Sequence, residues 1–167
     1  MLSEQIQTDR LLLRPFTLAD VSSVYTYWSS DSSWERFNAS VPQNFTREDA
    51  RQFVSEMIDR DREIQPNWAI LSENVVKGVV SLAFEQGHRI AVIGYGIHAN
   101  LRGRGLSAEA ARGVIEQAFE TYAQLNRIRA HTNSKNIASQ RVLEKFCLLY
   151  TSPSPRDATL SRMPSSA

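Results

Sequence analysis

The stretch Arg102-Gly103-Arg104-Gly105-Leu106-Ser107 lies between a strand-like run and a helix-like run, and it decides the fold that we expect. Its two glycines let the backbone turn sharply and approach a ligand closely, where a Cβ would obstruct the approach. The helix predicted over residues 107–122 offers unpaired N-terminal amides and the positive end of its dipole, which suit a pyrophosphate. Taken by itself, the stretch is equally compatible with a glycine-rich turn that carries two solvated arginines.

Two common nucleotide-binding loops do not match this stretch. No Gly-Lys-Ser/Thr follows the glycines, so it is not a P-loop. The glycine spacing and the late position in the chain also differ from the dinucleotide-binding fingerprint.

The segments on either side predict a sheet built mainly from hairpins. Three short runs of strand-forming composition cover residues 68–71, 78–84 and 91–97, and turn-like residues separate them. This spacing is typical of an antiparallel meander. Further strands are predicted over residues 11–16, where proline closes an apolar run, and over residues 127–132, where apolar and polar residues alternate.

Apolar residues at three- and four-residue spacing predict four helices. The first covers residues 18–28, the second begins after the capping residue Thr46, and the others cover residues 107–122 and 136–146. Leu18, Ile58 and Ile137 belong to the apolar stripes of the first, second and fourth helices, so we expect them to face the core. Trp28, Trp34 and Phe37 are expected mainly in the core, with one or two of them lining the acceptor groove.

Composition excludes several classes of protein. The chain has 167 residues, enough for one domain, and 19 Lys+Arg against 18 Asp+Glu give a net charge of +1, far from the basicity of a typical nucleic-acid-binding domain. The single Cys147 excludes an intrachain disulfide framework, and three scattered histidines predict no metal site. No apolar run is long enough for a membrane span. We therefore expect a cytoplasmic protein that binds neither nucleic acid nor membrane.

Four segments together resemble a known family. The order of strand, glycine-rich loop, helix, strand and a helix opened by Asn136 resembles the GNAT superfamily of acetyl-CoA-dependent N-acyltransferases, and more narrowly its RimJ/RimL branch. The matching segments are Thr8-Asp9-Arg10-Leu11-Leu12-Leu13-Arg14-Pro15-Phe16, Ile93-Gly94-Tyr95-Gly96-Ile97-His98, Gly103-Arg104-Gly105-Leu106-Ser107-Ala108-Glu109-Ala110 and Asn136-Ile137-Ala138-Ser139-Gln140-Arg141-Val142-Leu143-Glu144-Lys145. The resemblance implies an α/β (α+β) fold with a central mixed, mostly antiparallel sheet flanked by helices.

The resemblance also implies how acetyl-CoA is held. Backbone amides of Arg102, Gly103, Arg104, Gly105, Leu106 and Ser107 would bind the pyrophosphate. Exposed backbone groups of Ile97, His98 and Ala99 would pair with the pantetheine arm as an added strand does. Asn136 would hydrogen-bond the same arm, and Ser139 would lie near the thioester sulfur. An amine would then attack the thioester directly while a main-chain N–H of the splayed strand stabilises the oxyanion, so Cys147 is not needed as a nucleophile.

Three side chains are candidates for proton transfer, each with a simpler alternative. Ser139 could donate a proton to the leaving thiolate, or could serve only as a hydroxyl at a helix start. Glu85 could deprotonate the acceptor amine as a base, or could be a solvated acid in a turn. His98 could act as a base or shape the cofactor site, although a structural role is favoured.

The chain also departs from the family. Ser107 replaces the usual Gly or Ala, and Gly96 stands where a tryptophan is common. Residues 1–146 would form an acetyltransferase domain with an incomplete C-terminus, because the family continues with two further strands. The proline- and serine-rich residues 147–167, which resemble a translated sequencing adapter, are expected to be a disordered or artefactual tail. The strand over residues 127–132 would then be an open edge of the sheet.

The leading functional hypothesis is transfer of an acetyl group from acetyl-CoA to a primary amine, such as a protein N-terminus, by a monomer or homodimer. One alternative is the same chemistry on a small amine. The other is a non-catalytic acyl-CoA-binding module.

Overall fold

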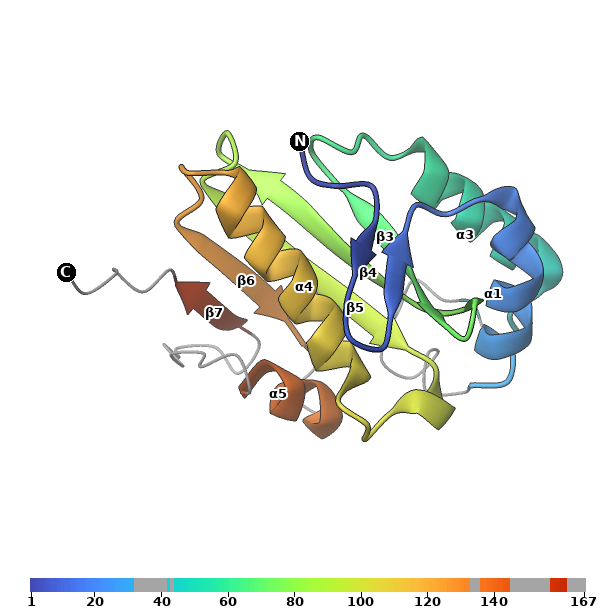
Figure 1. Cartoon of the computed structure of the whole chain (residues 1–167). Helices are drawn as coiled ribbons and strands as arrows, with labels where there is room; N and C mark the ends of the chain where they lie inside the picture. Colours follow the sequence, from blue (N-terminus) through green and yellow to red (C-terminus); the bar gives the residue numbers. More distant parts are fainter. Residues whose placement is uncertain (32–41, 43, 133–135, 145–156, 162–167) are drawn as a thin grey trace.

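A computed structural model describes residues 1–31, 42, 44–132, 136–144 and 157–161 (Figure 1). Its strands are β1 (Ile6–Gln7), β2 (Leu12–Arg14), β3 (Asn67–Ser72), β4 (Val75–Glu85), β5 (Ile90–Ile97), β6 (Arg127–His131) and β7 (Asp157–Ser161). Its α-helices are α1 (Val21–Trp28), α3 (Arg47–Asp59), α4 (Leu106–Thr121) and α5 (Ile137–Glu144). The short 3-10 helices η1 (Leu18–Asp20) and η2 (Ala99–Leu101) precede α1 and α4.

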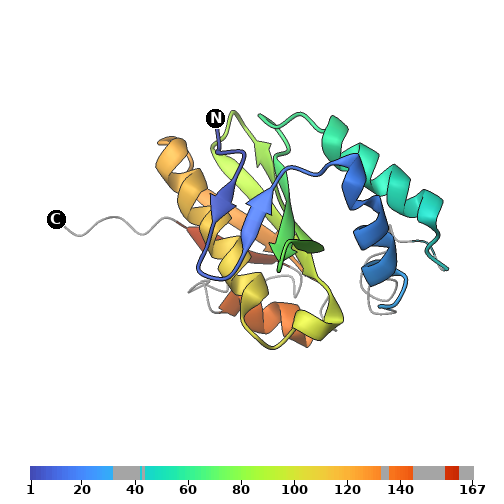
Figure 2. The same ribbon diagram turned by 45° about the vertical axis from the view of Figure 1, so that its right-hand side comes forward.

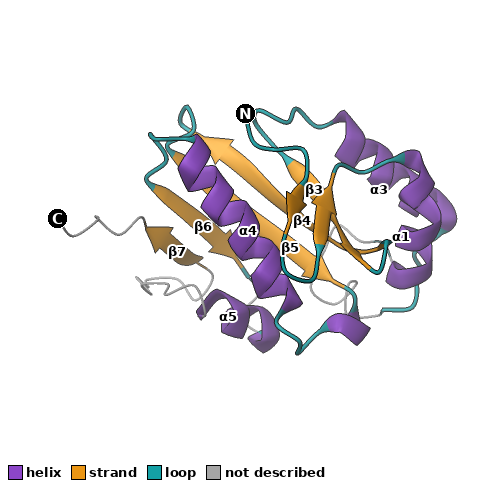
Figure 3. Cartoon of the chain, in the orientation of Figure 1, coloured by secondary structure: helices purple, strands orange, loops and turns teal. Residues whose placement is uncertain are grey.

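The strands form one sheet in the order in which they occur in the chain (Figure 3). Every neighbouring pair is antiparallel except β5 and β6, which are parallel and are connected through α4. The expected mixed, mostly antiparallel sheet flanked by helices is therefore confirmed, as is the meander formed by β3, β4 and β5. Close backbone approach within this meander depends on Gly78, because a Cβ there would lie 2.4 Å from the carbonyl oxygen of Gly96.

Helices cover both faces of the sheet. Figure 2 shows α4 on one side of the sheet and α1 and α3 on the other. The larger core cluster, with Trp68, Val80, Ile93 and Val114 among its members, lies on the α4 side. The smaller one packs Trp28 and Val54 of the helix pair onto Ala69 and its neighbours.

Local signals place the helix starts. The side chain of Thr46 accepts a hydrogen bond from the backbone amide of Asp49, and the carboxylate of Asp49 accepts one from the amide of Thr46. This reciprocal capping box begins α3 where the sequence predicts it.

Three residues of the predicted apolar stripes were wrongly placed. Leu18, Ile58 and Ile137 are 61%, 43% and 53% exposed. Leu18 and Ile137 are the first residues of η1 and α5, and Ile58 is the residue before the last of α3, so all three lie at helix ends. Trp28 is buried as expected, whereas Trp34 and Phe37 lie outside the described residues.

The expectation of an open edge at residues 127–132 is wrong. Strand β7 pairs antiparallel with β6 along its whole length, from Arg127 opposite Ser161 to His131 opposite Asp157. Residues 157–161 contain no proline, so each can donate to a ladder even though prolines occur on both sides of the segment. The proline- and serine-rich composition of residues 147–167 gave no sign of this short segment.

Among the described helices, none is long and apolar enough to span a membrane.

Candidate active site

Strand β5 extends beyond its parallel partner. The pairing with β6 joins residues 90–93 of β5 to residues 127–130, and β5 then continues to Ile97. Residues 94–97 keep their antiparallel partners on β4. Within the described part of the chain, the sheet therefore opens between β5 and β6 at this end, the end at which η2, the glycine-rich loop and α5 lie (Figure 1).

The glycine-rich loop adopts a backbone that exposes its amides. Gly103 and Gly105 both have φ +76°, a conformation that residues with a Cβ rarely adopt. A Cβ at Gly103 would meet no atom within 4 Å, and one at Gly105 would meet only the Arg10 guanidinium at 3.8 Å. Gly105 is the N-cap of α4, and no side chain caps the helix there. The first-turn amides of α4 are thus available to an anion.

The predicted pyrophosphate-binding residues lie together in this loop. Arg102, Gly103 and Arg104 are exposed, Gly105 and Ser107 are half-buried, and the side chain of Leu106 belongs to the core. Leu106 therefore anchors the loop while its backbone stays at the helix start.

A clamp from the β1–β2 turn holds the loop from one side. The Arg10 guanidinium donates to the Arg104 carbonyl at 3.0 Å and to Glu109 Oε2 at 2.6 Å. Glu109 Oε1 accepts from Thr8 Oγ1 at 2.6 Å and from the Arg10 amide at 2.8 Å. Burial alone would raise the pKa of Glu109, but these hydrogen bonds and the positive charge of Arg10 outweigh it and lower that pKa.

A buried carboxylate holds the loop from the other side. Asp31 is 5% exposed, and its Oδ2 accepts from the Ala99 amide at 3.0 Å and from Arg102 Nη2 at 2.8 Å. Arg102 Nε also donates to the Ile97 carbonyl at 3.2 Å. The guanidinium of Arg102 therefore fixes the loop. Asp31 was not predicted as a site residue, because it follows a helix-like run and resembles an ordinary helix breaker.

The expectation of free backbone groups at residues 97–99 is wrong for most of them. Ile97 and His98 are buried, the His98 amide donates to the Lys77 carbonyl, and the Ala99 amide donates to Asp31. Strand-like pairing with a ligand would have to use the preceding residues of β5, on the side where β6 has separated.

His98 has a structural environment. Its Nε2 lies 3.3 Å from the hydroxyl of Ser30, its Nδ1 lies 2.7 Å from Oδ1 of Asn100, and its ring packs edge-on against Tyr27. Both ring nitrogens have partners within the protein, so the structural alternative accounts for His98.

The start of α5 brings Asn136 and Ser139 together. Asn136 Oδ1 accepts a hydrogen bond from the Ser139 amide at 3.1 Å, which makes Asn136 the cap of this helix. The Ser139 hydroxyl lies 3.2 Å from the hydroxyl of Tyr95 on β5. Tyr95 was not singled out from the sequence, because an aromatic residue in an apolar strand is ordinarily core.

Glu85 lies away from the opened end of the sheet. Its side chain is exposed at the end of β4, where it pairs with Ile90. The opening begins at Gly94, which pairs with Ser81, four residues along β4 or roughly 13 Å at 3.3 Å per residue. A general base acts within hydrogen-bond reach or through one water, so a role for Glu85 would require the acceptor amine to bind near this end of β4. No group of metal-binding side chains occurs among the residues that the structure describes.

Sequence comparisons match this chain to acetyltransferases. The sequence model of the acetyltransferase (GNAT) domain matches residues 10–146. The uncharacterized N-acetyltransferase YnaD of Bacillus subtilis is 33% identical over 142 residues, which cover 84% of this chain and 80% of YnaD.

Solved structures share the fold. An acetyltransferase of the GNAT family from Bacillus anthracis superposes with a TM-score of 0.78 at 24% identity, covering 95% of this chain and 98% of that one. RimL, a ribosomal-protein α-N-acetyltransferase solved in complex with coenzyme A, gives 0.78 at 18% identity, covering 96% and 98%.

Proposed function

Because this chain belongs to the acetyltransferase (GNAT) family, we propose that it transfers the acetyl group of acetyl-CoA to a primary amine. One observation supports this most strongly: the uncapped N-terminus of α4, reached through the open loop at Gly103 and Gly105, lies beside the segment of β5 that has left β6. An anionic pyrophosphate and an extended arm attached to it would need these two features side by side.

The loop and its anchors fit acetyl-CoA, which supplies the acetyl group as a reactive thioester. The amides at the start of α4 would hold the pyrophosphate, and the exposed Arg104 adds positive charge beside them. The Arg10–Glu109 clamp and the Asp31–Arg102 pair would keep the loop in this shape before the ligand arrives. A loop already held in its binding conformation loses less conformational entropy when the ligand binds.

The start of α5 would serve the acyl end of the site. Asn136 Oδ1 is occupied as a helix cap, so the side-chain amide is the group that would donate to the arm. The Ser139 hydroxyl would supply the proton that the departing sulfur needs. We propose direct attack by the bound amine, with orientation contributing much of the rate acceleration.

We favour a protein N-terminal amine as the acceptor, because the fold matches that of RimL over nearly the whole of both chains. Thiol release from acetyl-CoA, measured over a panel of peptides and small amines, tests this choice. Peptide turnover supports it, turnover of small amines alone favours a small-molecule acetyltransferase, and coenzyme A binding without any turnover indicates a non-catalytic binding module.

A charge reversal tests the ligand site itself by calorimetric titration with coenzyme A. Arg104→Glu should weaken binding about three- to tenfold at low salt and less at high salt, since exposed charges are screened. The matched control is Arg89→Glu, the same change in the exposed turn at the other end of β5, which should leave binding unchanged. The loop would be excluded as the site if ATP bound as tightly as coenzyme A and both variants bound coenzyme A as tightly as wild type.

A further inference from the structure

One tyrosine connects the opened strand to the helix that carries Ser139. Tyr95 lies on β5 in the segment beyond the β6 pairing, opposite Val80 of β4. Its phenol oxygen is 3.2 Å from Ser139 Oγ and 3.3 Å from the Ser139 carbonyl oxygen. This contact joins residues 44 positions apart in the sequence. It joins β5 to the first turn of α5.

The tyrosine ring is a firm support for this contact. It is half-buried and packs against the larger core cluster beneath α4. A serine hydroxyl alone rotates among three staggered positions, whereas a tyrosine held by core packing keeps its oxygen in one place. The phenol therefore restricts the direction in which the Ser139 hydroxyl points.

The direction of the hydrogen bond decides what Ser139 can do. The phenol has one proton and the serine has one proton, so each can donate once. The Ser139 carbonyl can only accept, so the phenol proton points either to that carbonyl or to Ser139 Oγ, and in the first case the serine proton points to the phenol. If Tyr95 donates to Ser139 Oγ, the serine proton stays free to be given elsewhere. Burial raises the pKa of the Tyr95 phenol more than its bond to Ser139 lowers it, so the phenol keeps its proton at neutral pH and can donate.

We propose that Tyr95 is the positioning residue for Ser139, donating to its Oγ and directing the serine proton toward the acyl-transfer site. This rests on the proposed acetyl transfer. In that reaction Ser139 donates its Oγ proton to the sulfur as the new C–N bond forms and the C–S bond breaks, with the C–S electron pair remaining on sulfur. The proton lost by the attacking nitrogen passes to solvent, and solvent returns one to Ser139. Tyr95 itself keeps its proton throughout.

The test is a double-mutant cycle on steady-state rates in the intact chain. Tyr95→Phe removes only the hydroxyl and keeps the ring in the core. Since the serine would then sample three rotamers instead of one, we expect kcat to fall about three- to tenfold. The KM for acetyl-CoA should stay within about twofold, because the tyrosine acts on the proton-donation step and not on binding. Ser139→Ala should lower kcat at least as much, and the double variant should be no slower than Ser139→Ala alone.

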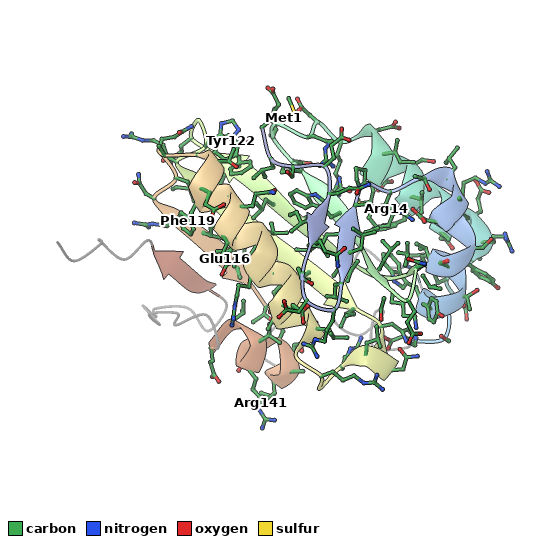
Figure 4. The ribbon with its side chains drawn as sticks, viewed as in Figure 1. Met1, Arg14, Glu116, Phe119, Tyr122 and Arg141 are labelled. Atoms are coloured by element: carbon green, nitrogen blue, oxygen red, sulfur yellow. The ribbon has the colours of Figure 1, made fainter. Side chains whose placement is uncertain are left out.

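The matched control is Tyr122→Phe. Figure 4 labels Tyr122 at the end of α4 away from α5. Its ring stacks on His88, so the control also removes one hydroxyl from a packed tyrosine. It should leave kcat unchanged. Melting curves of all variants fix an assay temperature at which each is folded.

Three results would overturn the inference while leaving acetyl transfer intact. They are an unchanged kcat in Tyr95→Phe, an unchanged kcat in Ser139→Ala, and effects that multiply in the double variant. The Ser139→Ala arm does not depend on how well Tyr95→Phe folds. A wild-type chain that turns over no amine in the panel would overturn the proposed function and this inference with it.

Discussion

Replacing Glu109 by glutamine should loosen the clamp that holds the glycine-rich loop. In Glu109→Gln the retained Oε1 can still accept from Thr8 and from the Arg10 amide. The new side-chain NH₂ group, however, faces the Arg10 guanidinium, which now contacts Oε2 at 2.6 Å. Two donors then oppose each other, so Arg10 loses its ion pair and its fixed position against the Arg104 carbonyl.

The magnitude follows from the exposure of the two partners. The side chain of Glu109 is 16% exposed and that of Arg10 is 52% exposed. A hydrogen bond to a charged group contributes about 1.5–3 kcal/mol, and an exposed ion pair contributes about 0.2–1 kcal/mol. For this half-exposed pair we expect a loss of about 1–2 kcal/mol in the free energy of unfolding, which corresponds to about 3–6 °C in Tm for a domain of this size.

Urea unfolding at pH 7 measures the loss, and calorimetric titration with coenzyme A measures its effect on the loop. The control is Glu116→Gln, which removes the same charge from an exposed position on the same helix (Figure 4). We expect Glu109→Gln to be less stable and to bind coenzyme A several-fold more weakly, and Glu116→Gln to resemble wild type. Equal stability and equal affinity in the two variants would refute the clamp.

The same clamp predicts a dependence on pH. Because folding lowers the pKa of Glu109, its contribution is fully present above the pKa of the unfolded chain and is lost as the pH falls through the lower, folded pKa. The stability difference between wild type and Glu109→Gln should therefore be largest near neutral pH and shrink below about pH 4. A constant difference from pH 7 to pH 3 would contradict this assignment.

Three further predictions concern the backbone and the second anchor. Gly78→Ala should lower the free energy of unfolding in urea by about 2–3 kcal/mol, because its Cβ would meet the Gly96 carbonyl at 2.4 Å. Gly103→Ala has open space and should lower it by about 1–2 kcal/mol from its positive φ alone, and equal losses would show that the close approach does not matter. Asn136→Ala should lower Tm through the loss of the α5 cap, about 0.5–2 kcal/mol, and an unchanged Tm would exclude the cap. Asp31→Asn should cost about 1–3 kcal/mol and weaken coenzyme A binding, since Arg102 loses the negative charge of its buried partner; stability unaltered by the change would contradict the anchor.

Local signals in the sequence were sufficient for most of the fold. Short β-rich runs between turn residues predicted β3, β4 and β5, alternation predicted β6, and helical spacing predicted α1, α3, α4 and α5. The capping residue Thr46 and the glycines at 103 and 105 act within a few residues of themselves, so their effects could be derived without knowing the fold. The motifs resembling GNAT proteins added the sheet type and the family.

The sequence could not show which residues meet across the fold. The pairing of β7 with β6, the burial of Asp31 against Ala99 and Arg102, and the contact of Tyr95 with Ser139 each join segments far apart in the chain. The distance of Glu85 from the opening could not be derived for the same reason, because only the register of β4 against β5 fixes it. Periodicity and capping are properties of neighbouring residues, so the sequence determined the elements and the loop. Register, burial and the partners of each polar group depend on how the elements pack, and only the tertiary structure decided those.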